Sequence, residues 1–176
     1  MPLKRTLWSV LFIVATLFVD LLWLHTWSTV ILFVQATLFV VLLTTITRPI
    51  LTSLLVAVIA GLGYAFFSAA NPWPYLVAFP AACLVAYIFI HRLATTRSLT
   101  SLLATVAVGT LAYYLTMVIL VLVLSLVRPS SLRSPISSLL LPATIQIFFH
   151  PLLAMIIWRL LGRGQYERIQ TLATPL

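Results

Sequence analysis

The sequence predicts an all-α polytopic membrane protein: a compact bundle of six transmembrane helices with both termini in the cytoplasm. Composition is the first reason, because 63% of the 176 residues are hydrophobic and 7% are charged. Soluble domains average about 45–50% apolar and about 25% charged residues. The mean hydropathy of +1.21 agrees. The second reason is the spacing of long apolar runs, and the third is the position of the basic residues between them. The alternating pattern of a membrane β-barrel is absent.

Six apolar runs are long enough to cross a bilayer. A helix needs about 20 mainly apolar residues, since each residue adds 1.5 Å across a hydrocarbon core of about 30 Å. Lys4 and Arg5 precede the first run as in a signal peptide, but no small-residue cleavage site follows, so we expect it to be retained. Residues 1–176 then form one transmembrane domain with spans at Leu7–Leu24, Thr29–Ile46, Ile50–Ala70, Trp73–Ile90, Leu99–Val127 and Ile136–Leu161.

The basic residues predict the orientation. The formal net charge of +8 would suggest nucleic acid on a soluble protein. Here the cations lie between apolar runs, where they set topology and meet lipid headgroups, so we expect no nucleic-acid partner. With the N-terminus inside, only Arg128 and Arg133 fall outside. The cytoplasmic set is Lys4, Arg5, Arg48, Arg92, Arg97, Arg159, Arg163 and Arg168.

Small residues recur at every fourth position of the third run. They are Ser53, Ala57, Gly61, Ala65 and Ala69. In lipid, helices associate through close packing and interhelical hydrogen bonds, so this stripe marks where another helix approaches closely. That helix belongs either to the chain itself, which we favour, or to a partner. A weaker version on the fifth run consists of Ser101, Thr105 and Gly109.

Asp20 is the single acidic residue inside a predicted span. An intramembrane acid is a functional candidate by default. Its depth, about one turn from the outer end of the first helix, favours the alternative of an interfacial carboxylate that is hydrated or paired with Arg128 or Arg133.

The sixth run holds the densest group of polar residues. Gln146 and His150 are four apart and share a helix face. They are either a recognition site inside the bundle or, as we favour, hydrogen-bonded to neighbouring helices, with Gln35 of the second run as a candidate partner. Pro142 and Pro151 each remove a backbone donor, which predicts helix kinks.

The sequence offers no arrangement typical of an enzyme. The three histidines are isolated, no His, Cys and carboxylate cluster has metal-ligand spacing, and no carboxylate pair is available for acid–base chemistry. We therefore expect no catalytic residue, no metal and no cofactor.

Three stretches resemble the family of bacterial rod shape-determining proteins called MreD. They are "GLGYAFFSAANPWPYLVAFPAACLVAYIFIHRL", "TTRSLTSLLATVAVGTLAYYL" and "QIFFHPLLAMIIWRLLGR". The last is similar to a family pattern of an amide, a proline five residues later and a basic tail, which Gln146 and Pro151 match. The acidic residue often found after the glycine of the third span is missing here, since Tyr64–Phe67 contains none.

This resemblance implies a non-enzymatic scaffold of the peptidoglycan elongation complex in the bacterial inner membrane. Such a protein binds MreC and, through it, joins MreB filaments to the polymerase RodA and a transpeptidase, with no small-molecule substrate. The alternative is the substrate-binding S component of an energy-coupling-factor vitamin transporter. Its ligand would meet polar residues at the outer side: Asp20, Trp23, His25, Trp27, Asn71 and Trp73.

Overall fold

The computed structural model describes residues 11, 14–16, 20, 35–67, 73–94, 98–127 and 135–161. All regular structure in these ranges is helical, which confirms the all-α class. Three described stretches are long and apolar enough to cross a membrane: Trp73–Leu93, Leu99–Leu126 and Leu139–Arg159. The first predicted span lies largely outside the described residues.

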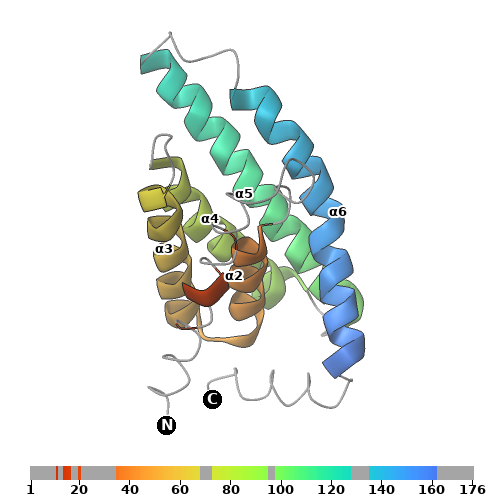
Figure 1. Ribbon diagram of the computed structural model, residues 1–176. Coiled ribbons are helices and arrows are strands. Elements are labelled where there is room, and N and C mark those ends of the chain that lie inside the picture. The colour runs from red at the N-terminus through yellow and green to blue at the C-terminus, as the bar shows by residue number, and fades with distance from the viewer. Residues whose placement is uncertain are drawn as a thin grey trace.

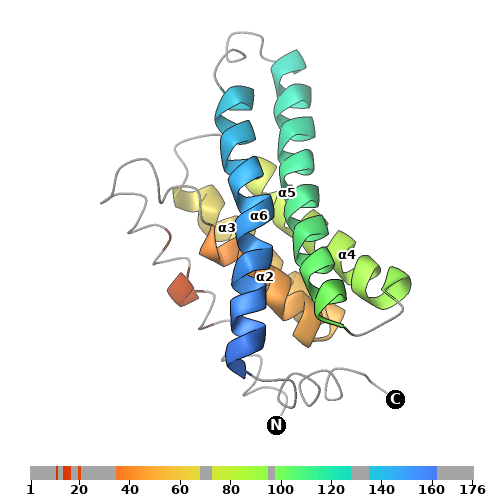
Figure 2. The same ribbon diagram turned by 90° about the vertical axis from the view of Figure 1, so that its right-hand side faces the viewer.

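The longer helices form an antiparallel series in which each contacts the next (Figure 1). The series is α3 (Ile50–Phe67), α4 (Trp73–Ile88), α5 (Leu99–Val127) and α6 (Pro135–Leu161). A single π-helical turn, η2 (Phe89–Leu93), extends α4. Figures 1 and 2 both show the end of α5 and the start of α6 extending beyond the other helices. The α5 bounds coincide with the predicted run, and those of α6 differ by one residue.

Helix α2 (Ala36–Thr47) is short and central. It contacts α3, α4 and α5, and both views place its first turn near the middle of the bundle's height. Its 12 residues reach about 18 Å, less than a bilayer core of about 30 Å. The sequence predicted one helix from Thr29 through Ile46, but Gln35 is not helical, with φ −80° and ψ 87°. The helix starts only at Ala36.

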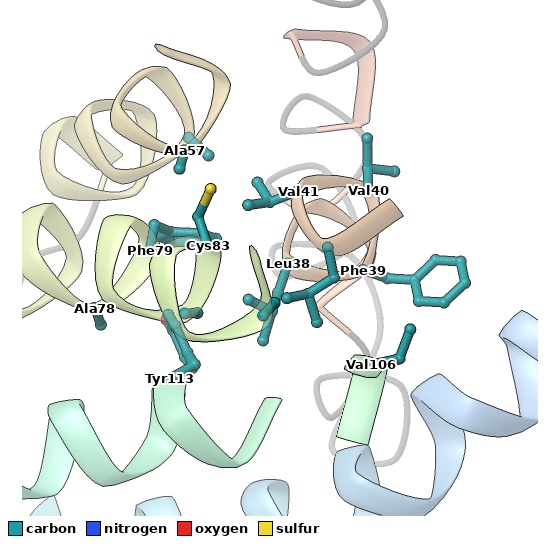
Figure 3. Packing of buried hydrophobic residues seen from close by; sticks show 14 of the residues in the cluster. Leu38, Phe39, Val40, Val41, Ala57, Ala78, Phe79, Cys83, Val106 and Tyr113 are labelled. Atoms are coloured by element: carbon teal, nitrogen blue, oxygen red, sulfur yellow. The ribbon is translucent and has the colours of Figure 1, made fainter. Parts of the chain in front are cut away.

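Helix α2 also supplies the centre of the hydrophobic core (Figure 3). Leu38, Val41 and Leu42 are completely buried. Val41 points toward Cys83 of α4, whereas Phe39 points to the opposite side of the helix. Helix α2 thus places buried side chains between α3, α4 and α5.

Two glycines lie where a Cβ would meet a neighbouring helix at close range. A Cβ at Gly61 would lie 2.9 Å from the Tyr75 carbonyl oxygen and 3.3 Å from Leu76 Cα, so α3 meets the backbone of α4 here. At Gly109 of α5 a Cβ would contact the end of the Leu42 side chain and lie 3.2 Å from Ala86 Cβ. Both contacts are made within this chain.

The rest of the small-residue stripe is buried in part. Ser53 and Ala57 are completely buried, as is Thr105 of α5, and Ser101 is nearly so. Ala65 is half-buried, and Ala69 lies outside the described residues. The stripe therefore faces the bundle at its N-terminal and central positions.

The prolines of α6 lie inside one uninterrupted helix. Pro142 and Pro151 are both half-buried within Pro135–Leu161. The structure adds a third internal proline, Pro80 of α4, which the sequence analysis did not single out.

Most hydroxyls in the helices bond to their own backbone. Thr45, Thr105 and Thr110 each donate to the carbonyl four residues earlier, at 2.7–2.9 Å. This pattern satisfies hydroxyl groups where water is scarce. The polar side chains that bond to groups on other helices are the exceptions, and they define the site described below.

Candidate functional site

The carboxylate of Asp20 lies at the start of α2. Its Oδ2 accepts hydrogen bonds from the Thr37 backbone N–H at 2.8 Å and the Thr37 hydroxyl at 2.6 Å. Its Oδ1 accepts from the Ala36 N–H at 3.2 Å. The Tyr64 hydroxyl of α3 donates to Oδ2 at 2.9 Å. Four donors from two helices therefore meet on one side chain.

These contacts explain why α2 begins where it does. The first N–H groups of a helix have no partner inside the helix, and a carboxylate is the acceptor that best suits them and the positive end of the helix dipole. Gln35, at the N-cap position, supplies no side-chain cap. Asp20, 16 residues before Ala36 in the chain, provides the acceptor instead. A buried helix end without one would leave backbone donors unsatisfied.

Asp20 is buried among protein groups, whereas the sequence analysis had favoured a carboxylate near the outer interface that is hydrated or paired with an arginine. It is 7% exposed, and its described partners are the start of α2 and Tyr64. Arg128 and Arg133, the expected alternative partners, lie outside the described residues. The burial of Asp20 follows from the break at Gln35. Because Gln35 is not helical, α2 begins at Ala36, and its first backbone N–H groups need a buried acceptor.

An aromatic series leads from this carboxylate through the bundle. The Tyr64 ring packs against Tyr75 and Phe79 of α4, with centroids 5.7 and 5.4 Å apart. Phe79 contacts Tyr113 of α5 edge-on at 5.0 Å. Tyr113 in turn packs against Tyr114 at 5.2 Å. Such edge-on and offset contacts stabilise packed aromatic side chains and fix their positions.

A second set of polar side chains connects α5 and α6 through two contacts that lie one helical turn apart. At one level the Thr110 hydroxyl and His150 Nδ1 lie 3.0 Å apart. At the other, Tyr114 interacts with the Gln146 amide. Gln35 completes the group: its Nε2 donates to the Tyr113 hydroxyl at 3.4 Å, and its backbone carbonyl interacts with the His150 ring. Phe39 covers that ring at 5.7 Å. We call Gln35, Gln146 and His150 the amide–imidazole cluster.

The structure thus brings together residues that the sequence indicated separately. Gln146 and His150 are 1% and 0% exposed, and Gln35 lies beside them. The sequence analysis missed Thr37, Tyr64, Thr110, Tyr113 and Tyr114. One signal was available for Tyr64, because it follows Ala57 and Gly61 on the buried face of α3 at helical spacing.

Metal binding finds no support in the part of the chain that the structure describes. Within those ranges, no three His, Cys, Asp or Glu side chains lie together as a metal site requires.

The hydrogen bond from Tyr64 to Asp20 makes a first prediction. Tyr64→Phe should lower the free energy of unfolding by about 2 kcal/mol, because a bond to a buried charged group is lost. Tyr75→Phe is the matched control, since it retains the ring that stacks on Tyr64. Unfolding in mixed detergent micelles measures both. Equal losses in the two variants would show that the Tyr64 hydroxyl contributes nothing specific.

Comparison with known protein families, with curated proteins and with solved structures finds no match to this chain. What the structure itself defines is an all-helical protein with helices long and apolar enough to cross a membrane.

Proposed function

We propose that this chain is a non-enzymatic membrane scaffold, a six-span inner-membrane subunit that holds partner proteins of the peptidoglycan elongation complex together. The observation that carries the proposal is that the buried Asp20 carboxylate is hydrogen-bonded by the protein's own helices. Asp20, the sole acid of the predicted spans, receives four donors from α2 and α3. A carboxylate so occupied supports the bundle and is not positioned to act on a substrate.

The arrangement of basic residues supports cytoplasmic termini. The α2–α3 turn, η2 and the end of α6 lie at the same end of the bundle, the lower half of Figures 1 and 2. These segments contain Arg48, Arg92 and Arg159. An excess of arginine at one end is the pattern that keeps that end in the cytoplasm. It also provides a surface suited to anionic lipid.

The outward surfaces favour binding in the membrane plane. Helix α6 exposes Phe148 and Leu152, by 75% and 47%. On α3 the exposed side chains form a stripe on the face away from Gly61: Leu51, Leu55, Val58, Leu62 and Phe66. Such faces accommodate lipid tails or the single helix of a bitopic partner. The resemblance to the MreD family suggests MreC as that partner and, through it, MreB, RodA and a transpeptidase.

The internal packing of Gly61 narrows the place where a partner could bind. Its contact with Tyr75 and Leu76 of α4 is already made, so a partner helix would use an outward face and not this position. The transporter alternative is weakened in the same way, because Asp20 is committed to α2 and is withdrawn from the proposed ligand set.

Affinity capture tests the proposal. The full chain, tagged and extracted in mild detergent, should recover a bitopic cell-shape protein and cell-wall synthases, identified by mass spectrometry. A tagged, unrelated six-span protein is the control. A copurifying vitamin with transporter ATPases, and no cell-wall proteins, would refute the scaffold and identify the S component instead.

A further inference from the structure

Helix α4 and η2 together match the thickness of a bilayer. The stretch Trp73–Leu93 has 21 residues, which extend over about 31 Å, against a hydrocarbon core of about 30 Å. Trp73, at one end, is exposed, and exposed tryptophan is typical of a membrane interface. Arg92 lies in the last turn at the other end. Its side chain is therefore expected at the level of the lipid headgroups.

One face of α4 is apolar and exposed, and it leads to this arginine. Leu84 and Ile88 lie four residues apart on that face, with 42% and 52% of their surface exposed. Arg92 follows four residues after Ile88 and is exposed as well. Leu84 lies about 12 Å from Arg92 along the helix, which is within the depth of one leaflet, about 15 Å. The exposed face therefore joins a cation at headgroup level to apolar side chains at acyl-chain level.

The π-helical turn η2 adds an apolar side chain beside the cation. The Ala94 N–H donates to the carbonyl oxygen of Phe89, five residues earlier, at 2.9 Å, so the turn is wider than that of an α-helix. α-Helical spacing would place Leu93 on the same face as the completely buried Ala86, seven residues earlier, yet Leu93 is 65% exposed. The last turn therefore presents Leu93 and Arg92 together at the edge of the span.

The part of the chain that the structure describes offers Arg92 no acidic partner. Asp20 is the sole acid in those ranges, and its hydrogen bonds are made to the start of α2 and to Tyr64. Lipid phosphate groups are the anions found at the headgroup level of a bilayer. The planar guanidinium of arginine suits them, because two of its N–H groups can donate to one phosphate.

We propose that α4 and η2 form a binding surface for one anionic phospholipid of the leaflet at this end of the bundle. The phosphate binds Arg92, and an acyl chain lies along Ile88 and Leu84. Charge complementarity argues for an anionic headgroup, and the apolar face beside it argues for a lipid, since a free phosphate would leave that face unused. The inference requires helices that cross a bilayer, but it depends neither on the scaffold role nor on which side of the membrane this end faces.

Native mass spectrometry of the full chain tests the headgroup preference. The protein, delipidated in mild detergent, is titrated with phosphatidylglycerol or with phosphatidylcholine of the same acyl chains. We expect the wild type to bind phosphatidylglycerol more tightly. Arg92→Gln should weaken that binding about five-fold, the effect of one basic residue near an anionic surface, and should remove most of the preference. Equal binding of the two lipids by the wild type would overturn the proposal.

Two further variants show whether the effect belongs to this surface. Arg159→Gln is the matched control, because Arg159 is an exposed arginine in the last turn of a different helix, α6; it should weaken phosphatidylglycerol binding less than Arg92→Gln does. Arg92→Lys keeps the charge and should retain most of the preference. Equal losses in the two glutamine variants would show that general surface charge attracts the lipid. If Arg92 served only the negative end of its own helix, Arg92→Gln would lower the melting temperature and leave the preference intact, which would also refute the site.

Photo-crosslinking locates the acyl chain. Phosphatidylglycerol with a diazirine in its acyl chain, mixed with phosphatidylcholine in vesicles that contain the protein, should label Leu84 and Ile88. The label should be lost in Arg92→Gln and kept in Arg159→Gln. Label spread evenly over the exposed faces of α3, α4 and α6 would contradict a bound lipid on α4. Neither lipid measurement involves a partner protein, so failure of this site and failure of the scaffold proposal can be told apart.

Discussion

Asp20→Ala should lower the free energy of unfolding by about 3 kcal/mol, among the largest effects of any single substitution in the described bundle. The variant loses the cap of α2, which is worth about 1 kcal/mol. It also leaves the Thr37 and Tyr64 donors buried without an acceptor, at about 1–3 kcal/mol. Detergent-induced unfolding followed by tryptophan fluorescence measures the loss.

Two comparisons separate this effect from simple loss of side-chain volume. Asp20→Asn retains one acceptor oxygen and should lose about half as much. Thr144→Ala removes an exposed hydroxyl that bonds its own helix and should stay within about 0.5 kcal/mol of wild type. If Asp20→Ala were as stable as Thr144→Ala, the carboxylate would not hold the start of α2.

The second large effect is expected at Gly61. Gly61→Leu should destabilise the protein by on the order of 3 kcal/mol, since overpacking a close contact commonly costs 1–3 kcal/mol and sometimes more. The atoms in the way belong to the backbone of Tyr75 and Leu76. They cannot rotate aside, so α3 and α4 must separate. Melting temperature and yield after extraction report the change.

A comparison of two alanine variants sharpens this prediction. Gly61→Ala places a Cβ against backbone, whereas Gly109→Ala places it against the end of the Leu42 side chain, which can rotate, and near the Ala86 Cβ. Alanine also gains about 1 kcal/mol over glycine in a helix. We therefore expect Gly109→Ala to remain within about 1 kcal/mol of wild type and Gly61→Ala to lose more. Val58→Leu, on the exposed side of α3, is the control and should be neutral. The reverse order of the two alanine variants would mean that side chains, and not backbones, limit helix approach.

Apolar run length was sufficient to predict the helices that pack in series. In a membrane protein the backbone must be satisfied within each helix, so composition and length largely determine where helices lie. The α5 bounds, Leu99–Val127, were obtained in this way. The interior of α4 shows the same rule at Pro80, where a residue that usually breaks helices is accommodated inside one.

The start of α2 could not be predicted from local sequence. Gln35 sits inside an apolar run, and the residue that stabilises the helix end, Asp20, comes from a different segment. Tertiary contacts of this kind leave no periodic signal. The same holds for Gly61, where the stripe predicted a close neighbour but the neighbour, α4, is known only from the packing.

The individual polar residues were visible, but their partners were not. Asp20, Gln146 and His150 were conspicuous because polar side chains are rare among so many apolar ones. Their partners Tyr64, Thr110 and Tyr114 are common residue types in membrane helices and gave no such signal. Pairing a rare residue with a common one requires the fold.

Membrane topology is the measurement that tests the account most directly. Single cysteines placed near each end of the chain, for example Leu3→Cys and Thr174→Cys, can be labelled with an impermeant thiol reagent from either side. The native Cys83 is completely buried, so the parent protein should stay unlabelled and serve as the control. We expect both new cysteines to react only from the cytoplasmic side. Labelling of the two ends from opposite sides would contradict an even number of spans and, with it, the proposed scaffold.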